Sequence, residues 1–130
     1  MSIHHVAITV SDPERAEAAF YRCVLAALGF VRQDGTGPAT IWRNPASDVA
    51  VHMLGVTDMH VHKPADPRAA VDHTAFRAAS RGVIDQIHAA LAALGAEILG
   101  PPRELPQFGP TYYALFARDP DGRLVELVHA

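Results

Sequence analysis

Four polar side chains interrupt apolar segments of this sequence, and their types are those that bind metal ions. They are His5, His52, His73 and Glu126. Imidazole and carboxylate groups suit iron, manganese, nickel and zinc, and two histidines with one carboxylate leave coordination positions open on the ion. Burying such groups singly would cost ~1–3 kcal/mol each. A shared divalent ion of one of these four kinds would satisfy them together, so the residues predict a metal centre.

A short repeat indicates how the chain would position these groups. The segment Leu-Ala-Ala-Leu-Gly occurs at 25–29 and again at 91–95. His5 lies 24 residues before the glycine of the first copy, and His73 lies 22 residues before that of the second. We therefore expect one domain over 1–130, made of repeat 1 at about 1–55, a linker at about 56–70 and repeat 2 at about 71–130.

The pattern of apolar and turn residues predicts the elements of each repeat. Ser11 or Asp12 can cap a helix that Pro13 begins and Gly29 ends, and Ser80 can cap a second helix at 81–94. Runs rich in β-branched and apolar residues predict strands at 3–10, 30–34, 39–43, 49–54, 71–78, 96–99, 111–118 and 123–129, with a loop at 100–110. The order is βαβββ twice, an α+β fold with mixed sheets.

Strand alternation places the four polar residues on equivalent faces. Val6, Ile8 and Val10 should pack against the helix, so His5 faces the other way. By the same alternation, His52, His73 and Glu126 lie on the opposite faces of their strands from their neighbours Val51, Thr74 and Val125, respectively. The four therefore occupy matched positions in two repeats. His52 could instead line a metal-free pocket, and the linker histidines His60 and His62 are interpreted as solvent-exposed residues rather than as a ligand pair.

Composition excludes several classes of function. The net charge is −3 with scattered signs, so no basic patch predicts binding of nucleic acid. Apolar runs fall short of the ~20 residues of a membrane span, and a strand at the N-terminus leaves no room for a signal peptide. We expect a cytoplasmic protein without a membrane partner. The single cysteine, Cys23, excludes a disulfide or a cysteine-based zinc site within the chain.

The motifs together resemble one family. HVAITV at 5–10, DHTAF at 72–76 and DPDGRLVEL at 119–127 are similar to segments of the vicinal oxygen chelate superfamily, which includes glyoxalase I, fosfomycin and bleomycin resistance proteins and extradiol dioxygenases. The resemblance covers the whole chain. It implies the glyoxalase/bleomycin resistance fold, in which two βαβββ repeats form a cupped mixed sheet.

The resemblance also implies a ligand set. Members of the family take metal ligands from the first and last strands of each repeat, and the matching positions are His5, His52, His73 and Glu126. Glyoxalase-like members generally have Glu or Gln at the position of His52, but a set of two histidines and one glutamate does not need that position. The departure bears on glutathione-linked isomerase activity more than on metal binding. Pairing of repeats in the family implies a homodimer, with sites formed within one chain or between two.

Two functions follow from the resemblance. The first is a metal-dependent lyase or isomerase, glyoxalase-like, acting on a small molecule that chelates the ion through neighbouring oxygens. Glu126 or His52 would serve as the base, while Tyr113, Arg77 and Phe108 would bind substrate. Tyr112 is the alternative to Tyr113, because only one of two adjacent strand residues faces the site. The second function is non-catalytic binding of a small molecule or antibiotic without metal, as in bleomycin resistance relatives. Extradiol ring cleavage is disfavoured, because the usual acid/base histidine and tyrosine cannot be assigned.

Overall fold

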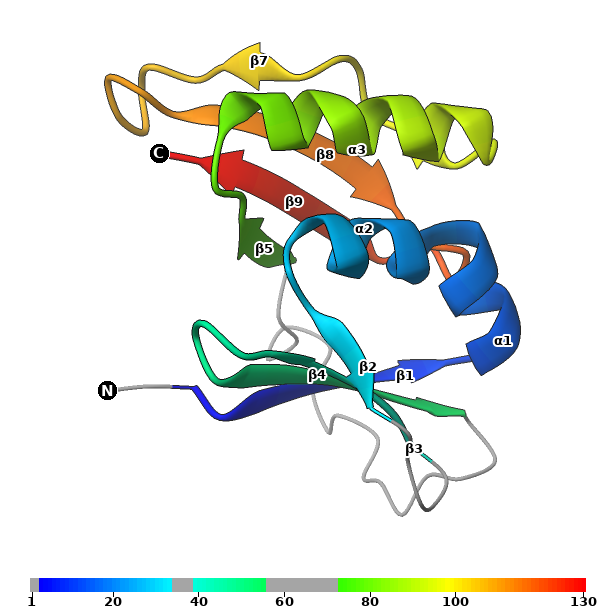
Figure 1. Cartoon of the computed structure of the whole chain (residues 1–130). Coiled ribbons are helices and arrows are strands. Elements are labelled where there is room, and N and C mark those ends of the chain that lie inside the picture. Colours follow the sequence, from blue (N-terminus) through cyan, green and yellow to red (C-terminus); the bar gives the residue numbers. More distant parts are fainter. Residues whose placement is uncertain (1–2, 34–38, 56–72) are drawn as a thin grey trace, which may run out of the picture.

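The computed structural model describes residues 3–33, 39–55 and 73–130 (Figure 1). Strands form two mixed sheets and a few helices accompany them, which confirms the predicted α+β class. The predicted linker, with His60 and His62, lies outside the described residues. Of the helices in the described ranges, none has the length and apolar character needed to cross a membrane.

Each repeat supplies one sheet. The first has the order β1-β4-β3-β2, with β1 (His5–Val10) parallel to β4 (Val49–Gly55), and with β3 (Ala39–Asn44) and β2 (Val31–Gln33) antiparallel. The second has the order β5-β9-β8-β6, from β5 (Thr74–Arg77), β9 (Leu124–His129), β8 (Tyr113–Arg118) and β6 (Glu97–Ile98). In both sheets the repeat's first strand lies at an edge and runs parallel to its last strand.

The helices begin and end where the sequence predicts, but the first is not uniform. Asp12 caps α1 (Pro13–Ala16), the π-helical segment η1 (Glu17–Tyr21) follows, and α2 (Arg22–Ala27) completes it. Ser80 caps α3 (Arg81–Ala93). The two repeated glycines have φ values of +90° and +75°, the left-handed conformation that ends a helix. The predicted 100–110 loop contains a short strand, β7 (Arg103–Glu104), paired with β8.

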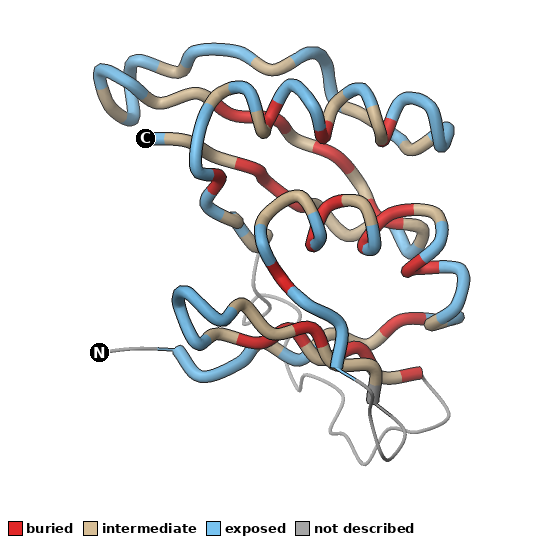
Figure 2. Tube along the Cα trace, in the orientation of Figure 1, coloured by how far each residue is buried: buried red, intermediate tan, exposed pale blue. Residues whose placement is uncertain are grey.

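The core lies between the helices and the inner faces of the sheets, where the buried stretches of the tube gather (Figure 2). Val51 and Met53 of β4, and Val125 and Leu127 of β9, are fully or almost fully buried, as the alternation predicts. A buried carboxylate of η1, that of Glu17, joins helix to sheet. It accepts hydrogen bonds from Trp42 Nε1 at 2.7 Å and Arg32 Nε at 3.1 Å.

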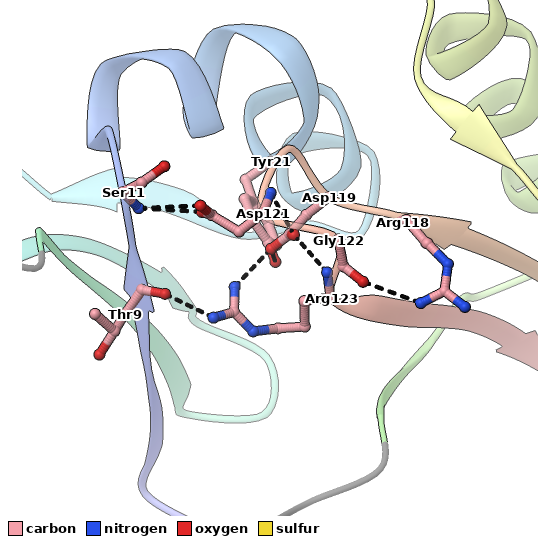
Figure 3. Close-up of polar contacts among 8 residues, drawn as sticks. All are labelled: Thr9, Ser11, Tyr21, Arg118, Asp119, Asp121, Gly122 and Arg123. Atoms are coloured by element: carbon pink, nitrogen blue, oxygen red, sulfur yellow. Dashed lines mark hydrogen bonds and ion pairs between the residues drawn. The ribbon is translucent and has the colours of Figure 1, made fainter. Parts of the chain in front are cut away.

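The turn between β8 and β9 fastens the second sheet to the first repeat (Figure 3). The side chain of Asp119 is fully buried and accepts hydrogen bonds from Tyr21 Oη and Arg123 Nη1, both at 2.6 Å. Arg123 Nη2 also donates to the carbonyl of Thr9 in β1 at 2.6 Å, and the amide of Ser11 donates to Asp121. We call Tyr21, Asp119, Asp121 and Arg123 the turn cluster. It connects β1 and β9, the strands that carry His5 and Glu126.

Candidate functional site: two half-sites

The first sheet brings His5 and His52 together. Register pairs His5 with Ala50 and Ala7 with His52, so the two imidazoles lie on adjacent strands of one face. Their rings stack with centroids 4.2 Å apart and planes 8° from parallel. Nδ1 of His5 also lies 2.9 Å from Nδ1 of His4. His5 and His52, two of the four predicted ligands, therefore lie side by side in the structure.

The surroundings of His52 favour its neutral form. Partial burial lowers the pKa of His52 below its ordinary value of 6.5, and the nearby His5, Arg43 and His4 lower it further. The neutral imidazole is the form that binds metal ions. His52 is therefore kept in a ligand-competent state at neutral pH.

The second sheet brings His73 and Glu126 together. Nε2 of His73 lies 3.0 Å from Oε2 of Glu126, whose side chain is only 5% exposed. The other oxygen of Glu126 accepts a hydrogen bond of 2.6 Å from the hydroxyl of Tyr112. That bond, together with burial and the negative carboxylate, raises the pKa of Tyr112 to about 12. Tyr112 therefore holds its proton against Glu126 throughout the neutral range.

The two adjacent tyrosines have opposite surroundings. Tyr113 packs against the core and its hydroxyl donates to Asp85 of α3 at 2.6 Å, with the Arg81 guanidinium 4.7 Å from the ring centroid. Tyr112, rather than the expected Tyr113, accompanies Glu126. Strand register explains the difference, because Phe116 pairs with Glu126 and Tyr112 shares its face with Phe116, whereas Tyr113 lies on the opposite face with Leu115.

The other two predicted substrate-binding residues lie in different places. The ring of Phe108 is 5.4 Å from that of Tyr112, the tyrosine whose hydroxyl is bonded to Glu126. Arg77 instead donates to the carbonyl of the C-terminal Ala130 at 3.4 Å. Arg77 also lines a cavity of about 520 Å³ whose other walls include Phe30, Phe76 and His129. None of the four predicted metal ligands lines that cavity.

The four predicted ligands thus form two pairs rather than one cluster. Among the residues that the structure describes, no three His, Cys, Asp or Glu side chains are grouped closely enough to hold a metal ion. We call His5 with His52 the imidazole pair, and His73 with Glu126 the carboxylate pair. Each is half of the ligand set that the sequence predicts.

The chemistry of each pair suits a divalent ion to a different degree. Two ligands at right angles, each about 2.1 Å from one ion, are about 3 Å apart. The carboxylate pair is joined by a 3.0 Å hydrogen bond between Nε2 of His73 and Oε2 of Glu126, and a bound ion would take the place of its proton. The imidazole pair supplies suitable nitrogens, but a ring nitrogen binds metal in the plane of its ring, and the planes here are nearly parallel. One of these rings must rotate before both can bind the same ion.

Known proteins share this arrangement of strands. A solved structure described as a proposed glyoxalase from Bacillus halodurans is 26% identical, has a TM-score of 0.74, and matches over 98% of this chain and 95% of its own. A lactoylglutathione lyase from Agrobacterium tumefaciens is 21% identical with a TM-score of 0.67, over 99% and 93% of the two chains, and shows likeness of fold.

Sequence comparison relates the chain to the same group of proteins. The uncharacterized protein YqjT of Bacillus subtilis is 29% identical over 128 residues, 97% of each chain. Residues 2–127 match the profile of the Glyoxalase/Bleomycin resistance protein/Dioxygenase superfamily. Because this profile matches nearly the full length of the chain, the chain belongs to that superfamily.

Proposed function

We propose that this protein is a metal-dependent lyase or isomerase, glyoxalase-like in type, whose substrate is a small molecule with neighbouring oxygen atoms. The observation that carries the proposal is the carboxylate pair, a buried glutamate held 3.0 Å from an imidazole nitrogen. The imidazole pair supplies the remaining ligands. A bound divalent ion, such as nickel, zinc, manganese or iron, would act as a Lewis acid that stabilises negative charge on a substrate oxygen.

Glu126 and the residues around it would then have separate chemical roles. Glu126 is the candidate base, with one oxygen turned to His73 and the other fixed by Tyr112. Because Tyr112 keeps its own proton, it orients the carboxylate without competing as a base. His52, kept neutral at pH 7, is the second candidate base. Phe108 adds an apolar surface beside Tyr112.

We further propose that two copies of the chain complete each site. In the described sheets β1 and β5 each pair on one side alone, so each leaves backbone donors and acceptors free at an edge. A second copy that offers β1 to β5 would bring an imidazole pair next to a carboxylate pair. Two-fold symmetry would then make two identical sites.

Metal content tests the first part of this proposal. Protein prepared without a polyhistidine tag is soaked in nickel, manganese, iron and zinc salts in turn, and elemental mass spectrometry measures the bound ion. We expect one ion per chain, with marked loss in His5→Ala, His73→Ala and Glu126→Ala and a smaller loss in His52→Ala. Protein that stays metal-free in all four salts contradicts the proposal and favours the non-catalytic binding function.

Mixing two defective variants tests the second part. His5→Ala and Glu126→Ala chains are each expected to bind little ion alone. After joint unfolding and refolding, half of the dimers contain one chain of each kind, and in a shared arrangement one of their two sites is intact. The mixture should then bind about one ion per four chains. A mixture as metal-free as its components would place each site within one chain.

A further inference from the structure

An aromatic surface adjoins the carboxylate pair. Phe108 is 67% exposed, the highest value among the large apolar side chains that the structure describes. Its ring lies 5.4 Å from that of Tyr112, whose hydroxyl is bonded to Glu126. We call Phe108 and Tyr112 the aromatic step. Phe108 lies at the exposed end of this pair of rings, and Tyr112 is hydrogen-bonded to the buried carboxylate of Glu126.

The backbone fixes the aromatic step in place. The amide of Phe108 donates to the carbonyl of Leu105 at 3.0 Å, and the amide of Leu105 donates to the carbonyl of Tyr112 at 2.9 Å. A further bond joins the amide of Tyr112 to Gly109. These bonds close the segment into a compact turn, so Phe108 is held next to Tyr112 before any ligand arrives.

The neighbouring ring is already covered. Phe116 pairs with Glu126 across the two strands, and its ring centroid lies 6.3 Å from that of His73. The Arg103 guanidinium lies over this ring, 5.5 Å from its centroid. Of the two rings described here, that of Phe108 is the one that the structure leaves exposed, while Phe116 is covered by Arg103. Flat rings offered in this way favour a flat apolar partner, through burial of surface and ring stacking.

We infer that the substrate carries an aryl group, which packs on Phe108 and Tyr112 while the adjacent oxygens reach the ion. This inference rests on the proposed function for the position of the oxygens, but the aryl contact itself does not depend on metal. It selects aryl compounds with neighbouring oxygens over short aliphatic ones. Phe108 is then a specificity-determining residue.

A pair of matched probes tests the inference. Benzohydroxamate and acetohydroxamate present the same two oxygens and differ in a phenyl against a methyl group. With metal-free protein, saturation-transfer NMR should show signal on the phenyl protons, reduced at least threefold in Phe108→Ala. Val31→Ala removes a comparably exposed apolar side chain, 54% exposed, from β2 of the other sheet and should change nothing.

Calorimetry on metal-loaded protein completes the test. The ratio of the acetohydroxamate to the benzohydroxamate dissociation constant should be roughly tenfold larger in wild type than in Phe108→Ala, as expected for covering one side of a phenyl ring. An unchanged ratio, or equal NMR signals in wild type and Phe108→Ala, would overturn the inference. The inference would also be overturned if the only effect of Phe108→Ala were weaker association between copies, measured by sedimentation.

The two proposals fail in different ways. If metal adds nothing to hydroxamate affinity while the phenyl signal still depends on Phe108, the proposed function is wrong and the aryl contact stands. If metal strengthens both probes equally and Phe108→Ala has no effect, the metal site stands and the aryl contact is wrong.

Discussion

Tyrosines are the residues whose ionisation this structure changes most clearly. All three tyrosines of the chain have raised pKa values: Tyr112 through its bond to Glu126, Tyr113 through its bond to Asp85, and Tyr21 chiefly through burial. Each hydroxyl donates to a carboxylate, so ionisation would oppose two negative charges at 2.6 Å. The folded protein therefore favours the neutral form of every tyrosine.

Ultraviolet titration should show this directly. We expect no tyrosinate absorbance step near pH 10, the ordinary value, and a step near 12 that Tyr112→Phe removes. Because the pKa values are higher in the folded state, the free energy of unfolding should fall as pH rises from about 10 toward 12. A full step near pH 10, in protein that circular dichroism shows to be folded, would contradict the hydrogen bonds described for these residues.

The lowered pKa of His52 predicts a loss of stability at acid pH, whereas the tyrosines predict one at alkaline pH. Its pKa is lower in the folded chain, through burial first and neighbouring cations second. The unfolded chain therefore binds a proton first as pH falls below 6.5, and the free energy of unfolding decreases there. Urea unfolding at pH 7 and pH 5 should show a smaller acid loss in His52→Asn than in wild type. Equal losses would contradict the assignment.

At the scale of elements, the sequence predicted order and faces better than internal detail. Asp12 and Ser80 cap the helix N-termini and the two repeated glycines end the helices as expected, because caps and left-handed glycines act locally. The π-helical segment η1 was not predicted. Its Glu17 bonds Trp42 and Arg32, both more than ten residues away, and no helical period reports such tertiary contacts. Strand β7 was missed because two residues carry no alternation.

The turn between β8 and β9 can be tested by an isosteric substitution. Asp119→Asn leaves the Arg123 guanidinium without its buried counter-charge, so the free energy of unfolding should fall by about 3 kcal/mol. Asp48→Asn is the matched control. Asp48 is 84% exposed in its pair with Arg43, so its effect should stay within about 0.5 kcal/mol. Urea denaturation measures both, and equal effects would contradict a stabilising role for the turn cluster.

At the scale of the whole molecule, the sequence could not predict how the two sheets are joined. Alternation predicts matched positions for His5, His52, His73 and Glu126, and the structure brings them together as two separate pairs, His5 with His52 and His73 with Glu126. The connection between repeats instead depends on Ser11 with Asp121 and Thr9 with Arg123, contacts across 110 and 114 positions. No local sequence pattern predicts contacts between residues so far apart in the chain.

A site shared between copies should couple metal binding to assembly. An ion that binds only the assembled form stabilises it by about 2.7 kcal/mol when present at 100 times its dissociation constant. Sedimentation equilibrium should therefore show tighter dimers with nickel or zinc than with excess chelator, and Glu126→Gln should weaken the response. Identical association with and without the ion would contradict a shared site.

The turn cluster has a mechanical consequence in such a dimer. Through Arg123 and Asp121 it ties β1, which would face one copy's junction, to β9, which would face the other. A displacement of β1 on ion binding would then be transmitted through these contacts to the strand that bears Glu126 at the opposite pocket. Occupancy of the two pockets would be interdependent, and the ion titration curve would depart from a simple hyperbola.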